Sequence, residues 1–273
     1  ESPPFIKGDL GGLLAQVEKM EGDPKMKKRT GIGFLVVSMV AMWMWTNRGH
    51  AYEGGEVANG GAIVGKVKWV GETPAVKKLN VERDKETCEG DKLSQVLIVS
   101  PEKGIKNAVV SLVEVKKGKK LDSFGNGAPQ LDQQKCVYNP YLQIIPAGAT
   151  LEILNNDGIL HNIHTTSSAN PPLNIAQPKF KKKINQKFDK PETIKFVCDV
   201  HSWMEAWVVV ADHPYYSVTD DQGAFRLTDV PPGAYQIKVW HETAGEQVKP
   251  VTIKEKGASK PFSCAWAPAG HGG

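Results

Sequence analysis

Residues 194–204 read IKFVCDVHSWM, an apolar run that passes directly into a short loop of metal-binding side chains. The β-branched and aromatic residues at its start indicate a strand over Ile194–Val197. After that strand, a thiol (Cys198), an imidazole (His201) and a thioether (Met204) fall within seven residues. Such a set of soft ligands needs one more strong ligand to hold a metal ion. We therefore expect a metal-binding loop at the end of a strand.

A further imidazole is available upstream, in the segment LHNIH of residues 160–164, which follows an apolar strand over residues 151–154. His161 and His164 are three residues apart, so they would face opposite sides of a strand. Two imidazoles and one thiolate in a plane, with a distant methionine on the axis, form the blue-copper arrangement. The spacing therefore predicts a metal site that brings one of these histidines to the Cys198 loop.

Residues 121–212 resemble the small cupredoxins, above all the amicyanin and plastocyanin group. The Cys-x2-His-x2-Met spacing looks like the short ligand loop of amicyanin. Asn155-Asn156 followed by the HNIH of residues 161–164 is similar to the first ligand element of that group. The resemblance implies a Greek-key sandwich in which His161 is a ligand and His164 is structural. It also implies one copper ion (Cu⁺/Cu²⁺) per chain, bound by His161, Cys198, His201 and Met204.

The resemblance also gives Asn162 a role beside the site. In such proteins its backbone N–H points at the cysteine sulfur, and its side chain ties the two ligand loops together. Two residues depart from the pattern, because Leu160 replaces the usual proline and Asp199 stands where relatives carry Ser or Thr. The second departure puts the side-chain tie in question. The edge of His201 is expected near the surface, within an apolar ring of Leu160, Ile159, Gly158 and Trp203.

The rest of the body predicts an all-β protein with a second sandwich. Residues 60–120 and 213–257, read together, resemble a carboxypeptidase-regulatory-like, transthyretin-type module, with specific DQG and PPGAY turns at 221–223 and 231–235. Neither half would bury its apolar face alone. We therefore predict one split sandwich with the cupredoxin domain, residues 121–212, inserted in it or flanked by it. Three serial β modules are the alternative, and residues 258–273 are expected to form a C-terminal tail.

The first 51 residues have the features of an export signal. A basic stretch at 26–29 precedes a 15-residue apolar run at 31–45, and Gly49-His50-Ala51 offers small residues at the −3 and −1 positions of a cleavage site. Residues 26–51 therefore predict export to the periplasm, and residues 1–25 fit neither a signal nor an anchor. The alternative is an uncleaved anchor that holds the protein at the inner membrane.

Export makes the cysteines oxidisable, so we predict a disulfide between Cys88 and Cys136. Cys264 is then the odd cysteine, either a free thiol or half of an intermolecular bridge.

The function expected from these features is electron transfer, without enzymatic activity. Cys198 has no neighbouring histidine, and the chain has no His-x-His pair, which disfavours multicopper oxidases and copper nitrite reductases. The net charge of +4 is too small to favour a nucleic-acid partner. The alternative is a copper chaperone or an accessory subunit of a larger redox complex. Expected partners are a cytochrome c, a periplasmic dehydrogenase or a membrane electron-transfer complex.

Residues 177–195 carry a local charge of +5. This segment is either a solvated edge strand or a docking face for an acidic partner.

Overall fold

The computed structural model describes residues 52–88, 90, 92–121, 127–255, 257 and 261–266. The export segment predicted over residues 26–51 and the preceding residues 1–25 lie outside the described residues. Within the described residues, no helix has both the length and the apolar character that crossing a membrane requires. The fold is all-β, as the sequence predicts, since the described helix is the single four-residue turn α3 (Lys85–Cys88).

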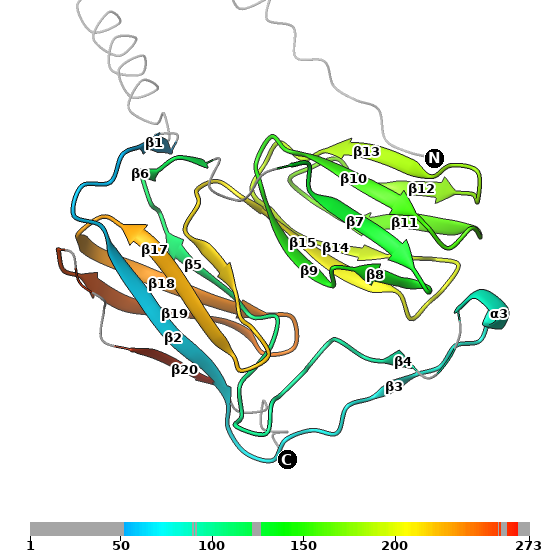
Figure 1. The fold of residues 1–273 in the computed structure, drawn as a ribbon, viewed down its shortest axis with the longest axis horizontal. Coiled ribbons are helices and arrows are strands. Elements are labelled where there is room, and N and C mark those ends of the chain that lie inside the picture. The colour runs from blue at the N-terminus through cyan, green and yellow to red at the C-terminus, as the bar shows by residue number, and fades with distance from the viewer. Residues whose placement is uncertain are drawn as a thin grey trace, which may run out of the picture. The chain divides into compact units, whose positions relative to one another are not determined.

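Two sheets form a first sandwich from residues 130–211 (Figure 1). One sheet has the strand order β13-β10-β7-β8, and the other has the order β12-β11-β14-β15-β9. Parallel pairing joins β10 to β7 and β15 to β9, while the remaining pairs are antiparallel. The strands are β7 (Gln130–Gln134), β8 (Val137–Asn139), β9 (Leu142–Pro146), β10 (Thr150–Asn155), β11 (His161–Thr166), β12 (Asn174–Gln177), β13 (Lys183–Lys187), β14 (Glu192–Val197) and β15 (Glu205–Ala211).

The core of the first sandwich follows from the period-2 alternation of its strands. Every second residue of β10 is buried, and so is every second residue of β11. A strand directs alternate side chains to opposite faces, so this pattern puts one face of each sheet inside. Ile153 of the first sheet and Ile163 and Phe196 of the second belong to one buried cluster. Cys198 and Met204 lie in the same cluster.

A second sandwich is built from strands at the two ends of the described chain. Its sheets have the orders β16-β5-β18-β19 and β17-β2-β20. β17 pairs with β2, and β18 pairs with β5, so residues 61–69 and 109–113 form one structure with residues 224–241, although the first sandwich lies between them in the sequence. The domain boundaries and the transthyretin-type character of this sandwich stay predictions. The strands are β2 (Gly61–Trp69), β5 (Val109–Val113), β16 (Tyr216–Val218), β17 (Ala224–Val230), β18 (Gly233–His241), β19 (Gly245–Ile253) and β20 (Phe262–Trp266), and a separate parallel pair joins β1 (Glu53–Gly55) to β6 (Lys117–Lys119).

The sequence predicts a C-terminal tail over residues 258–273, and the structure differs from that prediction. Residues 262–266 form β20, which pairs in parallel with β2. The physical reason is the alternation in this segment, because Cys264 and Trp266 are buried in the core of the second sandwich. Cys264 is a free cysteine whose sulfur donates to Gln247 Oε1 at 3.1 Å.

Between β2 and β5 the chain leaves the second sandwich as an extended arm, which we define as residues 72–94. In the arm, β3 (Lys78–Leu79) pairs with β4 (Lys92–Leu93), and α3 lies beyond them (Figure 1). Cys88, at the end of α3, forms a disulfide with Cys136 of the first sandwich. The predicted disulfide is confirmed, and it fixes the end of the arm to the first sandwich.

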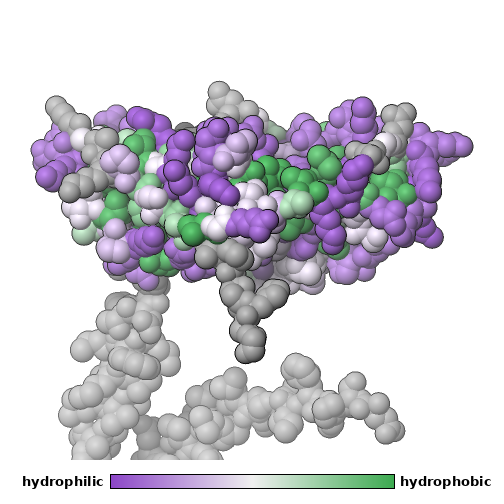
Figure 2. Space-filling view, turned by 90° about the horizontal axis from the view of Figure 1, so that it is seen from below, coloured by the Kyte–Doolittle hydropathy of each residue, from purple (hydrophilic) through white to green (hydrophobic). Residues whose placement is uncertain are grey.

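The surface is polar over most of the face shown in Figure 2, with smaller apolar areas between the hydrophilic ones. Among the described residues, the large apolar side chains that are exposed are Val70, Val76, Leu93, Leu160, Phe180 and Val248.

Candidate metal centre

Two neighbouring antiparallel strands bring His161 and Cys198 together. β11 begins at His161, and β14 ends at Val197, immediately before Cys198. The strands pair in a register that places His164 opposite Val197. The start of β11 and the residues after β14 therefore lie at the same end of the sheet.

The loop after β14 is short and closed by its own backbone. The N–H of Cys198 donates to the carbonyl of Met204 at 3.3 Å, and the N–H of Met204 donates to the carbonyl of His201 at 2.9 Å. β15 then begins at Glu205. These bonds close the turn, so that His201 lies near Cys198. Met204 is buried in the same core cluster as Cys198.

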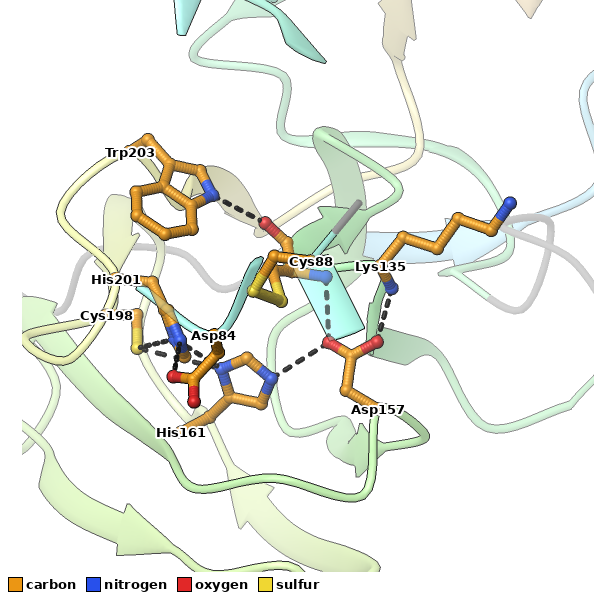
Figure 3. Close-up of a disulfide and its surroundings, with 9 residues drawn as sticks. Asp84, Cys88, Lys135, Asp157, His161, Cys198, His201 and Trp203 are labelled. Atoms are coloured by element: carbon orange, nitrogen blue, oxygen red, sulfur yellow. Dashed lines mark hydrogen bonds and ion pairs between the residues drawn. A yellow bond between two sulfur atoms is a disulfide. The ribbon is translucent and has the colours of Figure 1, made fainter. Parts of the chain in front are cut away.

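Three ligand atoms converge at this end of the sandwich (Figure 3). Cys198 Sγ lies 3.8 Å from His161 Nδ1 and 3.7 Å from His201 Nδ1, and the two Nδ1 atoms are 3.1 Å apart. A point equidistant from the three atoms lies about 2 Å from each, which is the length of a metal–imidazole bond. All three side chains are buried. The triangle therefore has the size of a metal site and is shielded from solvent.

The other ring nitrogen of each histidine faces a carboxylate. His161 Nε2 lies 2.9 Å from Asp157 Oδ2, and His201 Nε2 lies 2.9 Å from Asp84 Oδ2. Because a carboxylate accepts hydrogen bonds, each Nε2 carries a proton, and each Nδ1 is the ring atom that faces the sulfur. A metal ion between these three atoms would replace the proton that His161 shares with Cys198. The donor set of two imidazoles and a thiolate, with the thioether of Met204 in the same buried cluster as Cys198, fits copper.

Asp157 is held by the backbone as well as by His161. Its carboxylate accepts the N–H groups of Lys135 and Cys136, the second at 2.8 Å. Burial alone would raise the pKa of Asp157, but the bonds from His161 and these two N–H groups outweigh it and lower the pKa below its ordinary value. Asp157 is therefore ionised at neutral pH and fixes the ring of His161.

The surroundings of Cys198 also favour ionisation of its thiol. Burial raises its pKa, but hydrogen bonds from His161 and from the N–H of Asn162 outweigh this effect, so the pKa lies below the ordinary value for cysteine. Burial lowers the pKa of His201, and Asp84 opposes that effect only in part. Metal binding needs a thiolate and neutral imidazoles, so the shifts at Cys198 and His201 favour it. Burial would lower the pKa of His161, but its bonds to Asp157 and Cys198 outweigh burial and raise the pKa, so a metal ion would have to displace a proton there.

Asn162 lies beside the sulfur. Its N–H donates to Cys198 Sγ at 3.3 Å, and its side-chain oxygen accepts the backbone N–H of Asp199 at 3.4 Å. The tie between the loops thus uses the backbone of Asp199, so it does not depend on a Ser or Thr side chain there. The carboxylate of Asp199 instead faces His164 Nδ1 at 2.9 Å, which leaves His164 outside the donor triangle.

No protein-family model matches the chain, and neither does any curated protein sequence. Among solved structures, the chain is similar to a Cu(I) form of an amicyanin mutant, with 19% identity, 37% of this chain and 98% of that chain covered, and a TM-score of 0.29. It is also similar to a purple cupredoxin from Nitrosopumilus maritimus, with 23% identity, 30% and 99% coverage, and a TM-score of 0.24. A copper-containing nitrite reductase from Thermus scotoductus SA-01 matches with 19% identity over 32% of this chain and a TM-score of 0.28, and the match spans 23% of that reductase.

The predicted exposure of the His201 edge is wrong. The side chain is 0% exposed, because Asp84 of the arm contacts Nε2 and the indole of Trp203 packs 5.1 Å from the imidazole. Of the predicted apolar ring, Leu160 is the exposed member, at 47%.

Sequence reasoning missed both carboxylates. Asp157 precedes His161 by only four residues, so the sequence could have indicated this contact. Asp84 is 117 residues from His201 in sequence, and nothing local to either residue indicates their contact.

Proposed function

We propose that this chain would bind one copper ion through His161, Cys198 and His201, with Met204 as a weak fourth ligand, and that it carries single electrons. The observation that supports the proposal is the buried triangle of one sulfur and two Nδ1 atoms, with both Nε2 atoms held by carboxylates. Bound copper would supply a one-electron couple at this position.

The residues around the triangle suit electron transfer better than substrate chemistry. The thiolate and thioether favour the cuprous ion, while imidazole tolerates both oxidation states. The closed loop of residues 198–204 and the carboxylates behind the rings hold the ligands in one geometry, which keeps the rearrangement between oxidation states small. Burial of Cys198, His161 and His201 leaves no open side at which a substrate or a copper-accepting protein could reach the ligands.

A basic loop lies at the metal end of the first sandwich. Gln177 pairs with His161 in the sheet, so the loop that follows, residues 178–182, begins beside the first ligand. Phe180 in this loop is 81% exposed, and Leu160 is exposed on the neighbouring loop. Within the part of the chain that the structure describes, no ion pair involves the lysines of this loop, which are Lys179, Lys181 and Lys182.

This loop is the docking face that we propose for an acidic redox protein in the periplasm, such as a cytochrome c, a dehydrogenase or a membrane redox complex. The apolar side chains Phe180 and Leu160 would make the transient contact, and the lysines would steer the encounter. Electrons would then cross near Leu160, the residue directly before His161, since the His201 edge is covered.

Copper-loaded protein is expected to undergo reversible one-electron reduction by ascorbate and oxidation by ferricyanide, with loss and full return of its visible band. Ferricyanide is an anion, so its rate should fall several-fold when the ionic strength rises from about 0.01 M to 0.15 M, as the Debye length shrinks from about 30 Å to 8 Å. Stopped-flow absorption measures both effects. An irreversible change in the visible band would contradict the electron-carrier assignment.

Two triple variants separate steering from total charge. Serine in place of Lys179, Lys181 and Lys182 should slow the reaction with ferricyanide at low salt and leave it unchanged at high salt. Serine in place of Lys66, Lys68 and Lys254 removes the same charge from exposed positions in or beside the second sandwich and should have a much smaller effect. Equal effects of the two variants would contradict the docking face.

A further inference from the structure

The outer ring nitrogen of His201 contacts a residue from outside the first sandwich. Its Nε2 contacts Asp84 Oδ2 at 2.9 Å, and Asp84 belongs to the arm, which leaves the second sandwich between β2 and β5 (Figure 3). The imidazole is fully buried, whereas the side chain of Asp84 keeps 44% of its surface exposed. Asp84 therefore stands between His201 and solvent.

The local backbone holds Asp84 in this position. Its carbonyl accepts the N–H groups of Thr87 and Cys88, at 2.9 and 2.8 Å, which starts the turn of α3. Cys88 is bonded to Cys136, so the disulfide lies only one helical turn beyond Asp84. The arm is thus attached to the first sandwich directly beside the residue that contacts His201.

Cys136 connects the two carboxylates of the site. Its N–H donates to Asp157, the partner of His161, and its sulfur bonds to Cys88, next to Asp84. Its carbonyl accepts the indole N–H of Trp203 at 3.0 Å, and that indole packs on the ring of His201. One residue of the first sandwich therefore organises the surroundings of both imidazoles on their side away from the metal.

We propose that Asp84 is a positioning residue for the copper site: supplied by the disulfide-anchored arm, it orients His201 and stabilises the cupric form of the ion. This inference rests on the proposed function. A carboxylate that accepts the outer N–H of a metal-bound imidazole fixes the ring and makes it a more basic ligand. A more basic ligand and an added negative charge stabilise Cu²⁺ more than Cu⁺, so Asp84 lowers the reduction potential.

The test compares two charge-removing variants of the arm. Asp84→Asn keeps the shape of the side chain and removes its charge, and it should weaken Cu²⁺ binding about tenfold more than Cu⁺ binding. A tenfold change in that ratio raises the reduction potential by about 59 mV for one electron. Glu82→Gln removes the same charge two residues away, where the carboxylate accepts only from Asn80 in the described structure, and should leave the potential unchanged. Asp84→Glu should recover part of the shift.

A second measurement uses the metal-free protein. Diethyl pyrocarbonate acylates accessible neutral imidazoles, so His201 should be protected in the wild type and should react at least tenfold faster in Asp84→Ala. His161, whose partner Asp157 is unchanged, should stay protected in both and serves as the internal control. Mass spectrometry of the peptide containing His201 measures the rate.

The outcomes separate this inference from the proposed function. A wild-type protein that binds no copper contradicts the proposed function. Bound copper with equal potentials in Asp84→Asn and Glu82→Gln contradicts the role of Asp84 alone, as do equal acylation rates of His201 in the wild type and Asp84→Ala.

Discussion

Replacement of Cys198 by serine is expected to abolish the intense visible band of the copper-loaded protein and to weaken its copper binding by orders of magnitude. The sulfur is one corner of the ligand triangle, 3.7–3.8 Å from both Nδ1 atoms. A serine hydroxyl stays protonated at neutral pH, so the variant loses both the anionic ligand and the sulfur orbital from which the visible transition arises. Absorption spectra with copper analysis by mass spectrometry measure the two losses.

The matched control is Cys264→Ser. Cys264 is the other free cysteine and is likewise buried, but it lies on β20 in the core of the second sandwich. This variant should keep the band and the stoichiometry of the wild type. A band that survives Cys198→Ser, or one that disappears in Cys264→Ser, would show that Cys198 is not the coordinating thiolate.

The double variant Cys88→Ser, Cys136→Ser is expected to show the largest loss of stability. The disulfide closes a segment with a sequence separation of 48 residues, and a crosslink of that span stabilises the folded state by about 4 kcal/mol through the entropy of the unfolded chain. Urea unfolding of the metal-free protein, followed by tryptophan fluorescence, measures the change in the free energy of unfolding.

Cys264→Ser serves again as the comparison, because it also replaces buried sulfur by oxygen but breaks no crosslink. It should cost about 1 kcal/mol, the usual scale for a single substitution of this kind. If the double variant lost no more stability than Cys264→Ser, the disulfide would not be a stabilising link between the arm and the first sandwich.

Local patterns in the sequence are enough to predict several of the strands and the proximity of the candidate ligands. The alternation in residues 150–155 predicts β10 because burial of every second side chain is a property of the strand itself. Cys198, His201 and Met204 lie in one short turn, so their proximity follows from their spacing. The separation of His161 from His164 also follows from strand geometry, and the structure pairs His164 with Asp199 instead.

Contacts made by the arm could not be predicted in the same way. The described residues of the arm form two short strands and one helical turn, and the sequence of the arm has no periodicity that shows where it folds back. The burial of His201 depends on Asp84 in this arm, so the resemblance to small cupredoxins, which covers residues 121–212, predicts an exposed edge instead. The disulfide could be predicted only from the cysteine content and the expected export, and these gave no indication that it lies beside the candidate metal site.

Titration of the metal-free protein with copper, followed in the visible region, tests the central claim most directly. The buried triangle of His161, Cys198 and His201 predicts an intense thiolate-to-copper band that grows linearly and stops at one equivalent of Cu²⁺ per chain. A protein that stays colourless when fully loaded with copper, or that binds none, would contradict the assignment of these residues as a copper electron-transfer site.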